Sequence, residues 1–210
     1  MDLPTERLKD LMASWRQDFH QHPELGFKEV RTSGIVSQLL KSFGLKVFDN
    51  FGKTGVLGLL EKNKNKKIIA IRADMDALPI TEQTSLPYES EYPGSMHACG
   101  HDGHTSILLG AAKFLSEDKE FDGNILFIFQ PDEENGGGAK AMIADGLFQK
   151  FNISEIYALH NMPNMPVGYF ATREKTITAS ESAFEIEILS KGGHSALPSM
   201  GGDALLAASQ

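Results

Sequence analysis

Apolar residues recur three or four positions apart in two stretches near the start of the chain, residues 4–19 and 32–43. This spacing places them on one face of an α-helix. Gly44 follows the second stretch and suits the left-handed position that commonly ends a helix. The pattern therefore predicts two amphipathic helices that cover a core. The apolar face of the first consists of Leu8, Leu11, Met12, Trp15 and Phe19.

Further along the chain the pattern changes to short apolar runs that are typical of strands. Weak strand signals occupy residues 47–48 and 55–60, and stronger ones occupy 67–72, 124–129 and 155–159. Helical patterns at 103–117 and about 138–145 separate the stronger runs. Such β–α–β alternation predicts an α/β fold with a mostly parallel central sheet flanked by helices.

Each of the three strong strand signals is followed by acidic or histidine side chains. Asp74 and Asp76 follow the first, Glu133 and Glu134 follow the second, and His160 follows the third. Ligands of parallel sheets bind beyond the carboxyl ends of the strands. The sequence therefore predicts that these side chains gather in one functional site.

The pattern changes again after residue 176. Residues 181–189 alternate strictly between polar and apolar side chains, which predicts a half-buried strand of an open-faced sheet. A loop at 191–198 follows, and Asp203 is placed to cap a final helix at 204–209. We therefore expect a domain boundary near 176–180, with a first domain at 1–177 and the start of a second at 178–210.

The overall charge and the ends of the chain narrow the possible partners. The formal net charge of −8 argues against a nucleic-acid partner, and the lysine-rich run at 62–67 is typical of a solvated loop. The single cysteine excludes an internal disulfide and favours a reducing compartment. We find no signal sequence and no apolar run long enough to span a bilayer, so we expect a cytoplasmic protein without a membrane partner.

The densest group of reactive side chains lies at residues 96–104, where three histidines, an aspartate and the only cysteine occur together. In an extended backbone, Cys99 and His101 leave on the same side because they are two residues apart. Thiolate and imidazole suit zinc and its transition-metal neighbours, whereas magnesium and calcium prefer oxygen. This density of ligand types favours a metal site over a polar loop with a buried thiol.

The candidate ligands come from separate strand ends and are Cys99, His101, Glu134 and His160. With Asp74 and Asp76 nearby, they exceed the three protein ligands of a usual catalytic metal. Two divalent ions about 3.5–4 Å apart would use the surplus. Ligand softness does not choose among manganese, zinc, cobalt and nickel.

The adjacent acids Glu133 and Glu134 suit two different tasks on a bent loop. One can bind metal while the other faces the attacking water. The second then acts as general base, taking a proton from the water and passing it to the leaving amine. The position of the pair, after a buried strand and before three glycines, favours this interpretation over a solvated turn.

Five motifs together resemble the aminoacylase and hippurate-hydrolase branch of the dinuclear metallopeptidases, which also includes carboxypeptidases, N-acetyl-diaminopimelate deacetylases and auxin-conjugate hydrolases. The motifs are HACGHDGH at 97–104, RADMDALP at 72–79, FQPDEE at 129–134, HQHPELG at 20–26 and GGHSALP at 192–198. The resemblance implies a zinc-peptidase-like catalytic domain, followed by the start of a smaller α+β lid domain through which such enzymes dimerise.

The resemblance also implies a role for each matched residue. It implies that Cys99, His101, Glu134 and His160 bind metal, with Cys99 near both ions. Glu133 is then the base, Asp76 orients a ligand without binding metal, and Asp74 is placed beside it. His194 matches a lid histidine that reaches the active site of the partner subunit and steadies the oxyanion.

The expected activity is metal-dependent hydrolysis of the amide bond in N-acyl amino acids or small peptides. Family members run to nearly twice this length, so the chain resembles their N-terminal half. Two alternatives remain open. One is a truncated, non-catalytic metal-binding remnant, and the other is hydrolysis with Cys99 as nucleophile, which removal of metal would distinguish.

Overall fold

A computed structural model describes residues 6–63, 67–118, 120–180, 182 and 184–210. The chain folds as two compact units, Met1–Pro163 and Asn164–Gln210. This division falls ahead of the boundary expected near 176–180. None of the helices among the described residues is both long enough and apolar enough to cross a membrane.

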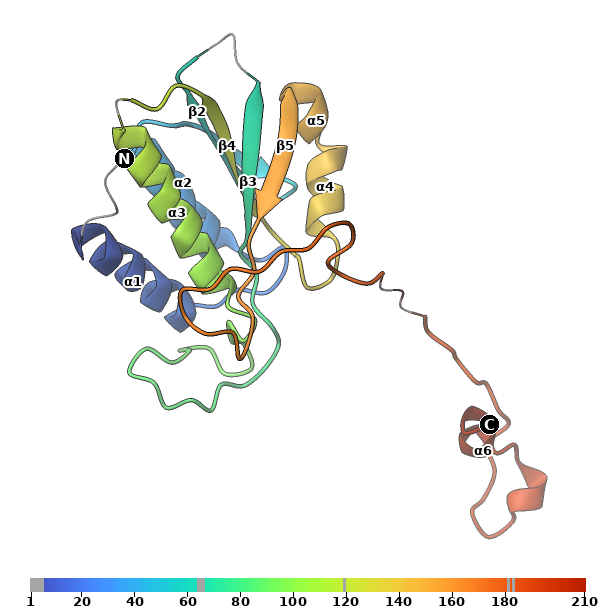
Figure 1. The fold of residues 1–210 in the computed structure, drawn as a ribbon. Coiled ribbons are helices and arrows are strands. Elements are labelled where there is room, and N and C mark those ends of the chain that lie inside the picture. The colour runs from blue at the N-terminus through green and yellow to red at the C-terminus, as the bar shows by residue number, and fades with distance from the viewer. Residues whose placement is uncertain (1–5, 64–66, 119, 181, 183) are drawn as a thin grey trace. The chain divides into compact units, whose positions relative to one another are not determined.

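The first unit holds a five-stranded sheet flanked by helices (Figure 1). The helices and strands predicted for this unit are all present, with small shifts of their ends. Pro4, where the first helix was expected to begin, lies outside the described residues, as do residues 64–66 of the lysine-rich loop. Gly44 has the left-handed conformation expected after the second helix, with φ of 82°. The elements are α1 (Glu6–Gln21), α2 (Val30–Ser42), β1 (Lys46–Phe51), β2 (Gly55–Glu61), β3 (Ile68–Asp74), α3 (His101–Glu117), β4 (Asn124–Gln130), α4 (Gly138–Ala144), α5 (Leu147–Lys150) and β5 (Ile153–Ala158).

The strand order is β1-β2-β4-β3-β5. β3 pairs in parallel with both β4 and β5, whereas β1–β2 and β2–β4 are antiparallel. The α/β class is thus confirmed, but the sheet is mixed rather than mostly parallel. The reason lies in the short turn between β1 and β2, since a connection of that length joins only antiparallel strands.

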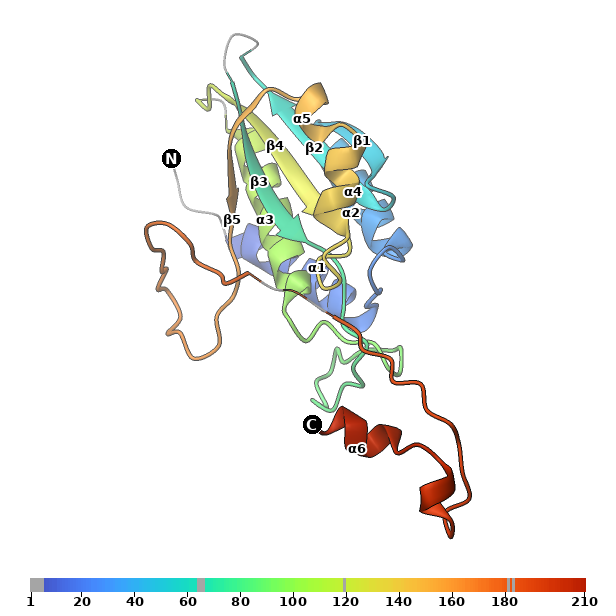
Figure 2. The ribbon, with the colours of Figure 1, turned by 90° about the vertical axis from the view of Figure 1, so that its right-hand side faces the viewer.

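The core has two layers because β4, buried along its whole length, packs on both of its faces. Phe127 and Phe129 lie in a cluster with side chains of α1, α2 and α3, whereas Leu126 and Ile128 lie in a cluster with α4 and α5. Figures 1 and 2 show these two groups of helices on opposite sides of the sheet. The result is a three-layer α/β/α unit whose parallel strands β3, β4 and β5 end at one edge.

The second unit has little regular structure among its described residues. It contains a 3-10 turn at Pro198–Met200 and the short helix α6 (Ala204–Ala208). Asp203 caps α6 as expected, by accepting a hydrogen bond from the backbone of Leu206 at 2.9 Å. The predicted strand at 181–189 is wrong for residues 182 and 184–189, which pair with no strand in the described part of the chain; residues 181 and 183 lie outside that part. An alternating segment needs a paired neighbour to form a strand.

Candidate metal centre

The carboxyl ends of β3, β4 and β5 bring together the side chains that were predicted to form a site. β3 ends at Asp74, β4 leads into the loop that carries Glu133 and Glu134, and β5 leads to His160. The helix α3 begins at the same edge with His101 as its first residue. The gathering of the strand ends is therefore as expected for parallel neighbours.

His101 is fully buried, and its two ring nitrogens lie in different surroundings. Its Nδ1 donates to the backbone carbonyl of Asp76 at 2.9 Å. Its Nε2 finds no hydrogen-bond partner among the described residues. Carboxylate oxygens of Asp74, Glu134 and Glu133 lie 3.7, 3.7 and 3.9 Å from this nitrogen. Nitrogen and oxygen ligands of one zinc ion lie about 2.0–2.2 Å from the metal, hence roughly 3–4 Å from each other, so this spacing suits a shared cation.

The charge around His101 also fits a cation. Burial by itself lowers the pKa of His101, but the side-chain carboxylate of Asp76, 3.4 Å from Nδ1, and the negative charges of Asp74 and Glu134 outweigh it and raise the pKa. Excess negative charge therefore surrounds a buried ring. A divalent cation would balance that charge, because buried carboxylates are normally paired or bound to metal.

Cys99 and His160 complete the predicted ligand set. The Sγ atom of Cys99 lies 3.4 Å from Nε2 of His160. One potential ligand atom each from Cys99, His101 and Glu134 lie within 4.8 Å of one another. Burial and the nearby charge of Glu134 raise the pKa of the Cys99 thiol to about 12. Without a cation this thiol stays protonated, which fits a ligand that becomes a thiolate only when metal is present.

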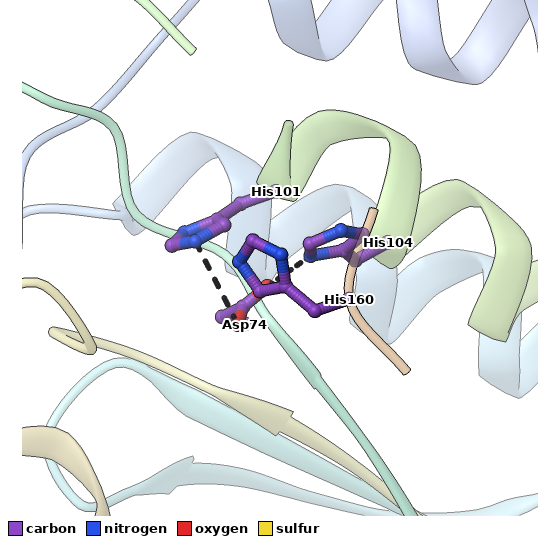
Figure 3. Close-up of side chains that lie close together, drawn as sticks. All are labelled: Asp74, His101, His104 and His160. Atoms are coloured by element: carbon purple, nitrogen blue, oxygen red, sulfur yellow. Dashed lines mark hydrogen bonds and ion pairs between the residues drawn. The ribbon is translucent and has the colours of Figure 1, made fainter. Parts of the chain in front are cut away.

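His104 has a different role, which the sequence did not reveal. It lies beside His101, Asp74 and His160 (Figure 3), and one ligand atom from each of the four lies within 4.8 Å of the others. The backbone N–H of Asn161 donates to Nε2 of His104 at 3.0 Å. The other nitrogen, Nδ1, must then carry the proton, which it donates to Asp74 at 2.7 Å. Both nitrogens of His104 are thus engaged with protein, and the residue links β3 to the segment that carries His160.

Asp74 is buried and ionised. Burial alone would raise its pKa, but the hydrogen bond from His104 and the charge of Arg72 lower it to about 2. Arg72 donates to Asp74 at 2.6 Å and to the side chain of Gln130, the last residue of β4, at 2.9 Å. Asp74 therefore ties the end of β3 to α3, and Arg72 extends this link to the end of β4.

The two loop acids lie in different environments. The backbone N–H of Glu134 donates to Asp76 Oδ2 at 3.1 Å, so Asp76 holds both His101 and this loop. Burial raises the pKa of Glu133, and the negative charges of Asp74 and Glu134 add to this although Arg72 and His101 oppose it. Asp76 thus lies where the resemblance places a residue that orients a ligand. A raised pKa lies closer to neutral pH, which suits a carboxyl group that both accepts and donates a proton.

Three further histidines of the motifs, His20, His22 and His194, have partners of their own. His194 belongs to the second unit, is exposed, and accepts the backbone N–H of Ala196 at 3.1 Å. His22 donates to the carbonyl of Asp18 at 2.8 Å, so it serves the turn at the end of α1. His20 lies between two carboxylates at the same turn.

Comparisons with known proteins identify relatives of this chain. The chain is 48% identical over 194 residues to a hippurate hydrolase of Campylobacter jejuni, covering 92% of this chain and 50% of that protein. It is 41% identical over 201 residues to an N-acetylcysteine deacetylase of Bacillus subtilis, covering 95% of this chain and 52% of that protein. The chain thus spans about half the length of these curated relatives.

Solved structures show the same relationship. A dinuclear metal binding peptidase of Bacillus subtilis matches 78% of this chain and 46% of its own with a TM-score of 0.73 and 40% identity. An aminohydrolase structure from methicillin resistant Staphylococcus aureus matches 97% of this chain and 55% of its own with a TM-score of 0.76 and 36% identity. The model of peptidase family M20/M25/M40 matches residues 70–208, which include the strand ends and the metal centre described above, and the chain therefore belongs to that family.

Proposed function

We propose that this protein is a metal-dependent hydrolase that cleaves the amide bond of N-acyl amino acids or small peptides. The observation that carries the proposal is the buried Nε2 of His101, which has no hydrogen-bond partner in the described part of the chain and is faced by three carboxylates. Cys99 and His160 lie beside it. The substrate class follows from the names of the relatives, which include a hippurate hydrolase, an N-acetylcysteine deacetylase and a thermostable carboxypeptidase of Saccharolobus solfataricus.

Two divalent ions, manganese, zinc, cobalt or nickel, would be held by the sulfur, nitrogen and oxygen atoms of the site. A divalent metal in such a site supplies Lewis acidity, which polarises a carbonyl and activates water. Asp76 fixes the ring of His101, and His104 with Asp74 fixes the segment that carries His160, through the backbone of Asn161. The proposed ligands are Cys99, His101, Glu134 and His160.

Glu133 is the proposed general base. It receives the proton of the attacking water and delivers it to the leaving nitrogen as the amide bond breaks. Its carboxyl is partly exposed, so it is open to a substrate, whereas Glu134 points one oxygen to within 3.7 Å of His101. The raised pKa of Glu133 supports its assignment as the base, with Glu134 as the metal ligand.

The second unit extends the proposal beyond the metal centre. We assign residues from about 178 onward to the start of a lid domain that mediates homodimer formation, with His194 reaching the active site of the partner subunit. There it would steady the oxyanion of the tetrahedral intermediate. We place the protein in the cytoplasm, consistent with its single cysteine.

Hydrolysis by Cys99 as nucleophile is less consistent with the burial of the thiol and the negative charge beside it. A thiol whose pKa is raised to about 12 has almost no thiolate near neutral pH, and the thiolate is the nucleophilic form. A thiol enzyme would need the opposite shift.

The test is an assay of the protein at its full natural length with hippurate, N-acetylcysteine and dipeptides. We expect turnover that a chelator abolishes and added manganese, zinc or cobalt restores. Turnover that survives removal of metal would favour the thiol alternative. A metal-loaded, folded protein that cleaves none of these substrates would instead favour the non-catalytic remnant.

A further inference from the structure

The loop that presents Glu133 and Glu134, residues 131–137 and here called the acid loop, turns sharply just before the two acids. Asp132 has a φ of 45°, in the left-handed region that L-residues seldom adopt. Its carbonyl accepts the backbone N–H groups of Gly137 and Gly138 at 3.2 and 3.0 Å. The direction in which Glu133 leaves the loop therefore depends on whatever holds Asp132 in this conformation.

Glu29 provides that hold from a distant part of the sequence. Its side chain is fully buried, and one oxygen accepts the backbone N–H of Asp132 at 2.8 Å. Its other oxygen accepts the hydroxyl of Thr54. Both oxygens of a buried acid are thus used, one of them on the backbone of the acid loop. An unpaired buried N–H is costly, so this hydrogen bond fixes the loop strongly.

Glu29 is available for this contact because Glu24, and not Glu29, caps the start of α2. Glu29 is the residue that precedes α2, where a side chain usually caps the helix. Instead, the two oxygens of Glu24 accept the backbone N–H groups of Arg31 and Thr32 at 3.0 and 2.8 Å. The helix end is satisfied without Glu29, whose carboxylate points across to the acid loop.

Gly26 completes the seat for Asp132. A Cβ atom at residue 26 would lie 1.9 Å from Oδ1 of Asp132, and one at Gly137 would lie 2.1 Å from Oδ2. The side chain of Asn135 donates to the same Oδ1 at 2.7 Å. The carboxylate of Asp132 is therefore enclosed on several sides and cannot move aside. Only glycine at residue 26 leaves room for this arrangement.

We propose that Glu29 and Gly26 are positioning residues that fix the acid loop, so that Glu133 and Glu134 face His101. On the far side of Glu133, Asp76 holds the backbone N–H of Glu134, so carboxylates anchor the loop on both sides of the base. The inference rests on the proposed function, in which Glu133 moves the proton and Glu134 binds metal. It gives Gly26 of the motif at residues 20–26, and Glu29 shortly after that motif, a role in the site.

The test compares Glu29→Leu, Glu29→Gln and Gly26→Ala in the full-length protein loaded with cobalt, using Glu24→Ala as the matched control. Glutamine keeps an oxygen for the N–H of Asp132 and can donate to the Thr54 hydroxyl, so Glu29→Gln should resemble the wild type. Glu29→Leu and Gly26→Ala should lower kcat by about 10²-fold, the loss that a displacement of about 1 Å can cause. Glu24→Ala should lower the unfolding midpoint but leave kcat unchanged.

The cobalt absorption spectrum and the cobalt affinity give a second readout that does not depend on turnover. We expect weaker cobalt binding and an altered spectrum for Glu29→Leu and Gly26→Ala, even if no substrate is cleaved, because Glu134 is displaced. If Glu29→Leu fails to fold, Gly26→Ala, compared with Glu29→Gln, still tests the proposal. Folded Glu29→Leu or Gly26→Ala with wild-type kcat and spectrum would overturn the proposal, as would equal loss in Glu24→Ala.

Discussion

His20 donates a hydrogen bond from Nδ1 to Asp102 at 2.8 Å, and Asp102 is the residue that follows His101 on α3. The other nitrogen of His20 lies 3.1 Å from a carboxylate oxygen of Glu82. Since a carboxylate can only accept, both nitrogens carry protons and the buried ring is a cation. Arg16 also donates to Asp102, at 3.0 Å, and stacks over the ring of Tyr88, whose edge meets His20.

This arrangement predicts a pH dependence of folding stability. The hydrogen bond to Asp102 raises the pKa of His20, and Glu82 adds to this although burial opposes it. Because the folded pKa is above the unfolded value, the stabilisation is fully present below about pH 6.5 and is lost as the pH rises through the folded pKa. His20→Gln should cost about 3–5 kcal/mol at pH 6, the typical cost of breaking a buried pair.

Urea unfolding of wild type and His20→Gln between pH 6 and 9 measures this effect. The difference between the two proteins should shrink as the pH rises. The control is His22→Gln, which removes a histidine from the same turn without touching Asp102. A constant difference across the range would mean that His20 is neutral in the folded protein.

The two loop acids should respond differently to the same substitution. Glu133→Gln should keep the metal content but lower kcat by about 10²–10⁴, the usual share of general acid–base catalysis. Glu134→Gln should lose metal as well, because an anionic ligand is gone. Metal analysis together with steady-state kinetics of the full-length protein checks both. Glu133→Gln with most of its activity intact would remove Glu133 as the base.

A great deal of this site could be predicted from the sequence, because its ligands follow strand ends and strand ends are marked by apolar runs. Parallel pairing of β3 with β4 and β5 then brings Asp74, Glu134 and His160 to one edge without further information. Periodicity does not specify pairing partners. It therefore gave no warning that β2 lies antiparallel beside β4, or that residues 182 and 184–189 would stay unpaired.

The contacts that orient the ligands could not be predicted from the sequence either. Glu29 accepts the backbone N–H of Asp132, which is 103 residues away in the sequence. Nothing in the sequence around Glu29 indicates this partner. His104 gave a weak signal, since it lies three residues after His101 and so on the same helical face. The structure shows that both of its nitrogens bond to protein, one to Asp74 and the other to the backbone of Asn161, and the second partner lies too far along the chain to be predicted.

His104 should act by holding other residues in place. His104→Ala removes the partner of Asp74 and of the Asn161 N–H, so we expect metal affinity to fall by about 10–100-fold with the number of ions per protein unchanged. His104→Asn can keep the hydrogen bond to Asp74 and should lose less. Competition with a chromophoric chelator gives the affinity, and elemental analysis gives the stoichiometry. Loss of one bound ion at saturating metal would instead identify His104 as a ligand.

The 210-residue chain by itself should associate through the edge of its sheet that β5 forms. Among the described residues β5 pairs only with β3, and its outer side carries unpaired backbone groups. Ile156 and Tyr157 on this strand are 45% and 55% exposed.

An exposed apolar edge strand is a template for pairing with another chain, and a lysine on such a strand is a common protection. Ile156→Lys should therefore increase the monomer fraction, whereas Ile107→Lys, at a residue of α3 that is 41% exposed, should not. Sedimentation velocity of the three proteins at micromolar concentration measures this. A wild-type chain that stays monomeric, or equal rescue by both lysines, would show that the edge of β5 does not drive association.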